Sequence, residues 1–136
     1  MKFVDTSWWV AWALPEDARH GEAMHMAARV GESERLLTTN LVLGETWTIL
    51  RSKDGHRAAV SLIDRVADLE SAGKFIVHAV TGEEETRAWR WLRRRDERVY
   101  SFVDATSFEV MRARRLRDAL AFDNDFAAAG FVEMRP

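Results

Sequence analysis

The chain has 136 residues, of which 20 are Lys or Arg and 22 are Asp or Glu, and 47% are hydrophobic. This length and apolar content suit one globular domain with its own core, so we expect a single domain over residues 1–136. The formal charge of -2 argues against a nucleic-acid binder unless basic residues are gathered locally. The absence of cysteine excludes disulfides and thiolate zinc sites, and the apolar run Trp8–Leu14 is too short to span a membrane. We therefore expect a cytoplasmic protein.

The first half of the chain is predicted to begin with a buried strand. Lys2–Val4 is a short apolar run that ends at Asp5, Thr6 and Ser7, whose side chains can accept hydrogen bonds from the first turn of a helix. A second strand is predicted at Arg35–Thr38. Four helices are predicted around it, over Trp8–Leu14, Asp17–Val30, Leu41–Arg51 and Gly55–Ala72, with Gly31 as the C-cap of the second.

The second half alternates strands and helices in the same way. Strands are predicted at Lys74–Val80, Asp118–Phe122 and Phe131–Met134, the last as an edge strand, and helices from Gly82 onward and over Ser101–Arg115. Because strands that alternate with helices favour a parallel sheet covered on both faces, the expected fold is a three-layer α/β/α sandwich. In such sheets, ligands bind beyond the carboxyl ends of the strands.

Several acidic residues are predicted at or near this edge. Asp5 ends the first strand, Asp123 and Asp125 follow the Asp118–Phe122 strand, and Asp104 is in the first turn of its helix. Each could simply cap a helix, and taken one at a time that is the better explanation. Their joint occurrence near one edge of a sheet is instead typical of a site for Mg²⁺ or Mn²⁺, which prefer oxygen ligands.

Glu45 is on a predicted helix face that is otherwise largely apolar. The positions three and four residues away are Leu41, Val42, Thr48 and Ile49, and none is a Lys or Arg. A carboxylate in such surroundings needs a partner that offsets its desolvation. That partner is either a metal ion or an arginine brought from elsewhere in the fold.

Four segments carry the candidate acids. They are MKFVDTS at residues 1–7, TTNLVLGETW at 38–47, SFVDATSF at 101–108 and ALAFDNDF at 119–126, the last followed by AGF at 129–131. Together they resemble the PIN-domain family and, within it, the VapC-type toxins of bacterial toxin–antitoxin pairs. No segment is specific by itself, but their order and spacing match the family over nearly the whole chain.

The resemblance implies a metal-dependent endoribonuclease that hydrolyses RNA phosphodiester bonds as the toxin of such a pair. It implies Mg²⁺ or Mn²⁺ as the cofactor, with the ligands Asp5, Glu45, Asp104 and Asp123. The polar residues that would support these ligands are Thr6, Asn40, Ser107 and Asp125. Asp125 departs from the family pattern, because it is a second acid two positions after Asp123, and either of the two could face the metal.

RNA, in this family tRNA or ribosomal RNA, is the expected substrate, and it needs basic surface near the acidic site. Two arginine clusters qualify. The first has Arg87, Arg90, Arg94 and Arg98 at helical spacing, and the second has Arg112, Arg114, Arg115 and Arg117. Either cluster alone could be a solvated helix face. With the acidic site present, we expect RNA contacts from at least one, and the first is our candidate.

The six tryptophans are unusual for a chain of this length. Trp47 and Trp91 fit apolar stripes of the predicted core. Trp8, Trp9 and Trp12 cannot all face one side of a short helix, so at least one is expected to be exposed and to anchor an interface. The resemblance implies that this interface is with a cognate antitoxin or with a second copy of the chain, as a homodimer.

Three alternatives stay open on the sequence alone. A receiver-type signalling domain would need paired acids after the first strand and a lysine after the last, and neither is present. A PIN-like module without catalysis could bind RNA or protein, although the intact acid set argues against it. A structure-specific 5′-nuclease acting on DNA shares the acids but is usually longer. A zinc site is disfavoured because His20 and His25 do not share a helix face.

Overall fold

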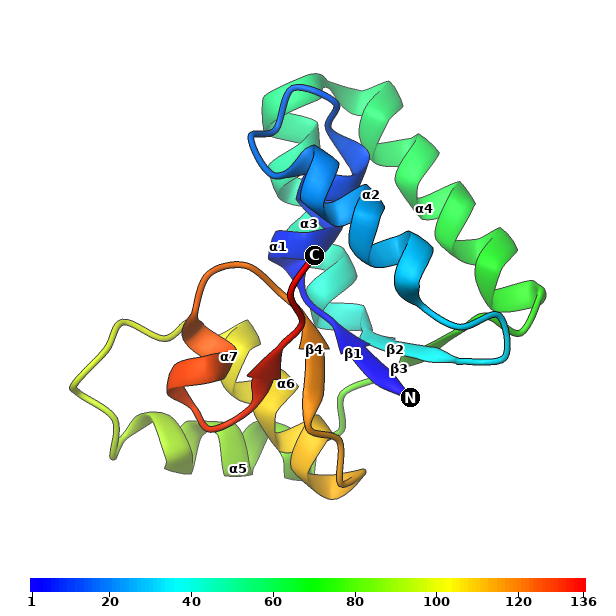
Figure 1. Cartoon of the computed structure of the whole chain (residues 1–136). Helices are drawn as coiled ribbons and strands as arrows, with labels where there is room; N and C mark the ends of the chain where they lie inside the picture. Colours follow the sequence, from blue (N-terminus) through cyan, green and yellow to red (C-terminus); the bar gives the residue numbers. More distant parts are fainter.

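Five strands form one sheet in which every neighbouring pair runs parallel (Figure 1). The computed structural model describes all of residues 1–136, and the strand order is β3-β2-β1-β4-β5. The strands are β1 Lys2–Val4, β2 Leu36–Thr39, β3 Phe75–His78, β4 Asp118–Leu120 and β5 Val132–Glu133. The predicted α/β architecture with a parallel sheet is confirmed, and the last strand is at an edge as expected.

Seven helices connect the strands and cover the sheet. They are α1 Thr6–Ala13, α2 His20–Arg29, α3 Asn40–Asp54, α4 His56–Ser71, α5 Gly82–Leu92, α6 Phe102–Ala113 and α7 Asp125–Ala128. Figure 1 shows α1 to α4 in the upper part of the view and α5 to α7 in the lower left, with the strands between the two groups. No helix has the length and apolar character that crossing a membrane requires.

The middle of the sheet is buried on both faces, which explains why its strands are continuously apolar. Phe3 of β1 is level with Leu37 of β2 and Ala119 of β4, and all three residues are fully buried. In the same register, Val4 pairs with Leu120. Because β1 and β4 end at the same level, the residues that follow them meet at one edge.

The helix predicted from Gly82 ends earlier than its arginine spacing suggested. α5 ends at Leu92 and Arg93 is its C-cap, so Arg94 and Arg98 lie in the connection to α6. The prediction that all four candidate arginines share a helical face is therefore wrong. Leu92 is the last apolar residue before a run of exposed charged side chains, and that run offers no apolar face to pack against the fold.

Two other predicted boundaries differ for local reasons. β4 ends at Leu120 instead of Phe122, because the Phe122 N–H donates to the Ser7 hydroxyl and not to a neighbouring strand. The C-cap of α2 is Val30 in an extended conformation, so Gly31 does not cap that helix. The remaining boundaries agree with the predicted ones to within one helical turn.

The tryptophans of α1 are covered by the fold, contrary to the prediction of an exposed one. Trp8 and Trp9 are 3% and 0% exposed, and Trp12 is half-buried beneath an arginine guanidinium. This helix packs against both α2 and α3, which explains why its tryptophans are covered. The exposed tryptophan is Trp89 of α5, at 50%. The tryptophans that pack against the core, as expected, are Trp47 and Trp91.

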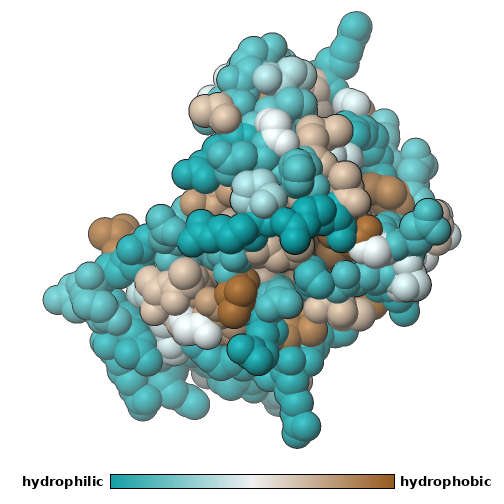
Figure 2. All heavy atoms as spheres, in the orientation of Figure 1, coloured by the Kyte–Doolittle hydropathy of each residue, from teal (hydrophilic) through white to brown (hydrophobic).

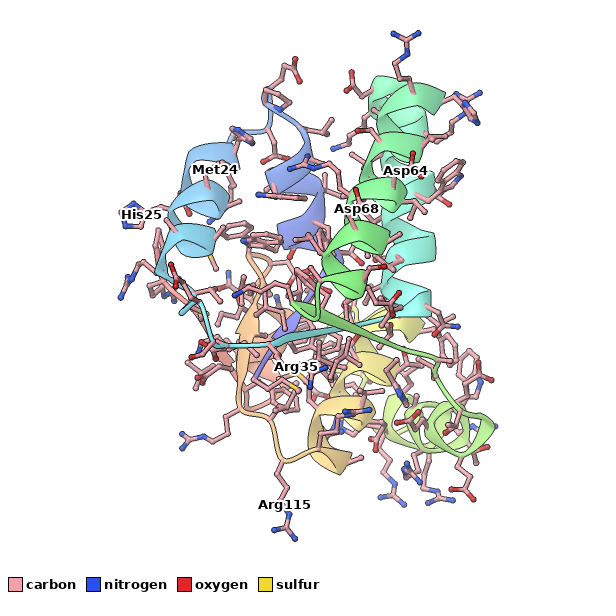
Figure 3. All side chains as sticks on the ribbon, turned by 90° about the vertical axis from the view of Figure 1, so that its right-hand side faces the viewer. Met24, His25, Arg35, Asp64, Asp68 and Arg115 are labelled. Atoms are coloured by element: carbon pink, nitrogen blue, oxygen red, sulfur yellow. The ribbon has the colours of Figure 1, made fainter.

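Hydrophilic residues cover most of the surface in view, and the hydrophobic areas between them are small (Figure 2). His25 on α2 and Arg115 after α6 both point away from the molecule (Figure 3). His20 instead has its Nδ1 atom 2.8 Å from the Ala11 carbonyl oxygen. As expected, the two histidines do not converge on a common site.

Candidate metal centre

A cavity of about 420 Å³ opens where β1 and β4 end. The four acids predicted as metal ligands all line it, namely Asp5, Glu45, Asp104 and Asp123. They come from four separate segments: the end of β1, the middle of α3, the first turn of α6 and the connection after β4. Their location beyond the carboxyl ends of parallel strands is where ligands are expected in this class of fold.

Asp5 is the N-cap of α1 and also faces the cavity. The backbone N–H and the hydroxyl of Ser7 both donate to its Oδ2 atom, at 3.1 and 2.7 Å. The Ser7 hydroxyl in turn accepts from the Phe122 N–H at 3.0 Å, so it ties the end of β1 to the segment that carries Asp123. Since both bonds to Asp5 use Oδ2, its Oδ1 atom remains available to a ligand.

Asp104 divides its oxygens in the same way. Its backbone N–H donates to the Ser101 hydroxyl and its Oδ2 accepts from the Ser101 N–H, both at 2.9 Å. This reciprocal pair is a capping box, which fixes the first turn of α6. The Oδ1 atom takes no part in it. The helix-cap explanation and the metal-site explanation are therefore compatible for Asp104.

Asp123 and Asp125 have different surroundings. Asp123 lines the cavity, whereas Asp125 does not and instead accepts from Arg98 Nε at 2.6 Å. Arg98 also donates to the Asp123 carbonyl oxygen at 3.0 Å. Carboxylate oxygens of Asp104, Asp123 and Asp125 nevertheless lie within 4.8 Å of one another. Asp104 and Asp123 thus belong both to the acids that line the cavity and to this close group of three. Asp125 belongs only to the group of three, and one of its oxygens is held by Arg98.

Glu45 is half-buried on α3, and Ile49 on the same face also lines the cavity. Glu45 forms no salt bridge with any Lys, Arg or His. The alternative in which a distant arginine compensates this carboxylate is therefore not realised. A cation in the cavity is the partner that remains.

Burial raises the pKa of three of these acids. It is the largest cause for Asp5, whose pKa rises from 3.8 to about 8, and repulsion from Asp123 adds to it. Burial likewise raises the pKa of Asp104 and of Asp123 to about 6, with repulsion from Asp125 contributing in both. A divalent cation would relieve this repulsion and favour the ionised carboxylates.

The residues predicted to support the ligands divide into two groups. Thr6 lines the cavity, and its buried hydroxyl has no hydrogen-bond partner in the protein. Asn40 instead accepts from the Val80 N–H at 2.9 Å and secures the segment after β3. The Ser107 hydroxyl donates to the Val103 carbonyl oxygen at 2.8 Å within α6. Of these three, only Thr6 is at the cavity.

The arginines predicted to contact RNA are absent from the lining of the cavity, although Arg98 contacts the segment that carries Asp123. Arg87 and Arg98 are engaged by acids, Arg87 at 3.6 Å from Glu109 and Arg98 with Asp125. The two exposed arginines without a salt bridge are Arg90 and Arg94. None of the four lines the cavity.

The cationic residues that do line the cavity were missed by sequence reasoning. They are Arg19, just before α2, and Lys53, in the last turn of α3. Lys53 is eight residues after Glu45, with Ile49 between them, so helical spacing could have indicated it. Arg19 had no comparable signal, because it lies in a turn between two helices.

Glu133 is another buried acid that the sequence did not single out. It is 7% exposed on β5 and accepts from the N–H groups of Asn124 and Ala127, at 3.3 and 3.0 Å. Glu133 therefore binds the free N–H groups at the start of α7. Asp125 is the first residue of that helix, and the Ala127 N–H donates to Glu133 and not to Asp125.

The donors at the cavity suit a hard divalent cation. They are carboxylate oxygens, two of which are left free by helix capping, together with the unpartnered Thr6 hydroxyl. No histidine lines the cavity and the chain has no cysteine. Oxygen-only sites of this kind are typical of Mg²⁺ and Mn²⁺ rather than of zinc.

Comparison with known proteins agrees with this geometry. Residues 2–132 match the model of the PIN domain family. The chain is 52% identical over 136 residues to the 23S rRNA-specific endonuclease VapC20 of Mycobacterium tuberculosis strains CDC 1551 and H37Rv, covering 100% of this chain and 99% of the relative. The crystal structure of Mycobacterium tuberculosis VapC20, a sarcin–ricin loop cleaving toxin, has a TM-score of 0.90 and 51% identity with full coverage of both chains. The chain therefore belongs to the PIN-domain family and, within it, to the VapC-type toxins.

Proposed function

We propose that this protein is an endoribonuclease that uses Mg²⁺ or Mn²⁺, held by the four acids of the cavity, Asp5, Glu45, Asp104 and Asp123. The observation that carries the proposal is the convergence of these carboxylates from four separate segments, three of them with raised pKa values. Membership of the family supports phosphodiester hydrolysis as the reaction. The complete acid set favours it over a module that only binds RNA or protein.

The bound cation supplies activation of water and stabilisation of the charge that develops on the phosphate. The protein contributes preorganised ligands, because the helix caps fix the carboxylates of Asp5 and Asp104 before substrate binds. Thr6 borders these ligands with a buried hydroxyl that has no hydrogen-bond partner in the protein. Asp125, held by Arg98, fixes the segment that carries Asp123 and is a positioning residue.

The substrate we propose is a loop of 23S rRNA, since the relative at 52% identity is a 23S rRNA-specific endonuclease and a sarcin–ricin loop cleaving toxin. Both the length and the fold of the two proteins match over their whole extent. From its membership of the VapC-type toxins, we further propose a cognate antitoxin as the protein partner, a homodimer as the assembly and the cytoplasm as the location.

The test is cleavage of an end-labelled hairpin that carries the sarcin–ricin loop sequence. Cleavage is expected with Mg²⁺ or Mn²⁺ and none with EDTA. Glu45→Gln is expected to lower the rate by more than about a hundredfold, because even groups that only support metal ligands cost 10–100-fold when lost. Glu70→Gln, an exposed site on α4, is the matched control.

Two outcomes would contradict the proposal. Cleavage that persists in EDTA would exclude metal-dependent hydrolysis. Binding of the hairpin without cleavage, at any concentration of Mn²⁺, would identify a non-catalytic module.

A further inference from the structure

We infer that Lys53 and Arg19 form a phosphate-binding pair that holds the RNA backbone beside the scissile position, an inference that rests on the proposed function. They are the cationic side chains among the thirteen residues that line the cavity. Five of the other lining residues are acidic: Asp5, Asp17, Glu45, Asp104 and Asp123. A polyanion can approach such a surface only where cations neutralise its phosphates.

Lys53 is placed by the helix that also carries Glu45. Glu45, Ile49 and Lys53 follow one another at intervals of four residues, and all three line the cavity. Lys53 is two turns beyond Glu45, which corresponds to about 12 Å along the helix axis. This separation sets the lysine apart from the proposed ligand Glu45, so that it would bind a neighbouring phosphate of the same strand and not the scissile one.

The Lys53 ammonium group is free to bind such a phosphate. It is exposed and has no carboxylate within salt-bridge distance. Glu16, Asp17 and Asp54 border it on another side, in a second hollow that shares Asp17 and Lys53 with the cavity. The phosphate-binding surface therefore ends at Lys53, and the RNA strand is expected to turn away from the protein there.

Arg19 is placed on the side of Asp123. Its guanidinium carbon lies 5.2 Å from the centroid of the Phe122 ring, and Phe122 directly precedes Asp123. Its backbone N–H is held by Asp17 at 2.8 Å. Its one salt bridge, to Glu22 at 3.3 Å, joins two side chains that are 49% and 44% exposed. Such exposed pairs are weak, so a phosphate can replace Glu22.

Salt dependence separates a phosphate contact from other roles. For single-stranded nucleic acid, each neutralised phosphate contributes about 0.7 to the slope of log affinity against log salt concentration. We therefore expect Lys53→Ala and Arg19→Ala each to reduce this slope by about 0.7. KM for the hairpin should rise several-fold at low salt, with kcat within about twofold of wild type, and Lys53→Arg should restore KM.

The experiment measures cleavage of the sarcin–ricin hairpin in Mn²⁺ at several KCl concentrations, with melting temperature as the folding control. Arg51→Ala is the matched control, because Arg51 is an exposed cation two residues before Lys53 on α3 and does not line the cavity. Hairpin binding, read by fluorescence anisotropy with Ca²⁺ in place of Mn²⁺, gives the same slopes without turnover.

The inference would be overturned if Lys53→Ala and Arg19→Ala had the same salt-dependence slopes and the same KM values as Arg51→Ala. A fall in kcat with unchanged KM and slope would also overturn it, because it would assign these residues to the chemical step. If the wild type binds the hairpin but never cuts it, the proposed function fails, while the anisotropy slopes still decide whether the pair binds phosphate.

Discussion

Asp5 and Asp104 each divide two carboxylate oxygens between a helix and the cavity. In both, Oδ2 accepts the hydrogen bonds that cap the helix and Oδ1 takes none. An aspartate at a helix N-terminus is usually explained by capping alone. Here the cap is also what fixes the carboxylate, so the position of the free oxygen is set by the backbone before any cation binds.

The raised pKa values predict how the stability of the metal-free protein depends on pH. Between about pH 4 and pH 8, folded Asp5 retains a proton that the unfolded chain has lost, and the free energy of unfolding falls as the pH rises through this window. Asp104 and Asp123 add to the fall up to about pH 6.

Asp5→Asn should flatten this fall and stabilise the metal-free protein at pH 8, on the order of 1–3 kcal/mol, since it removes the charge that burial disfavours. Urea unfolding in EDTA at several pH values measures it, and Mn²⁺ should stabilise the wild type at pH 8 but not the variant. Parallel pH curves for the two proteins would show that Asp5 does not hold this proton.

Asp123→Asn is expected to be more damaging than Asp125→Asn. Asp123 lines the cavity, whereas Asp125 is engaged by Arg98. Loss of the Asp125 carboxylate should therefore weaken metal affinity by roughly ten- to a hundredfold without abolishing turnover at saturating Mn²⁺. The measurement is cleavage rate against Mn²⁺ concentration for both variants. Rescue of Asp123→Asn by Mn²⁺, with Asp125→Asn inactive throughout, would reverse the assignment.

At the scale of elements, the site depends on the level at which β1 and β4 end. Their register pairs Val4 with Leu120, and the segments that follow are joined through the Ser7 hydroxyl, which donates to Asp5 and accepts from Phe122. α3 then contributes both a predicted ligand, Glu45, and the cationic side chain of Lys53 in its last turn. The cavity is thus built between elements, and no single element contains it.

Removal of the Ser7 hydroxyl should loosen this junction. Ser7→Ala leaves the Phe122 N–H without its acceptor and Asp5 with one bond fewer, which is expected to cost about 1–3 kcal/mol of unfolding free energy. The Mn²⁺ concentration needed for half-maximal cleavage should rise as well. Ser52→Ala, at an exposed position on α3, is the control, and equal stability of the two variants would contradict the role given to Ser7.

At the scale of the whole molecule, the near-neutral charge hides a segregated distribution. Acids line the cavity, and five arginines lie between residues 87 and 95 without an acid among them. The fold covers the tryptophans of α1 and leaves Trp89 exposed. A protein of this kind can bind RNA despite a net charge of -2, because the relevant charges are local.

Expression of the protein in a bacterial cell should arrest growth, and co-expression of its cognate antitoxin should reverse the arrest. Both follow from the VapC-type membership and the intact acid set. Colony counts after induction measure the effect, with Glu45→Gln at matched protein levels as the harmless control. Normal growth with soluble wild-type protein would argue against a toxin.

Sequence patterns predicted the alternation of strands and helices, the family and the acids that meet at one edge. These are readable because apolar periodicity, helix caps and motif order are local properties of the chain. Glu45 was identified in the same way, as a carboxylate on an apolar helix face.

The set of polar groups that reach the cavity depends on how the elements pack, and it could not be predicted from the sequence. Arg98 had helical spacing with Arg94 but is paired with Asp125, and Arg19 had no signal yet lines the cavity. The partners of a long charged side chain come from segments remote in sequence, and they depend on strand register and on where each helix ends. Those are outcomes of packing, so the direction of an arginine could not be deduced from spacing alone.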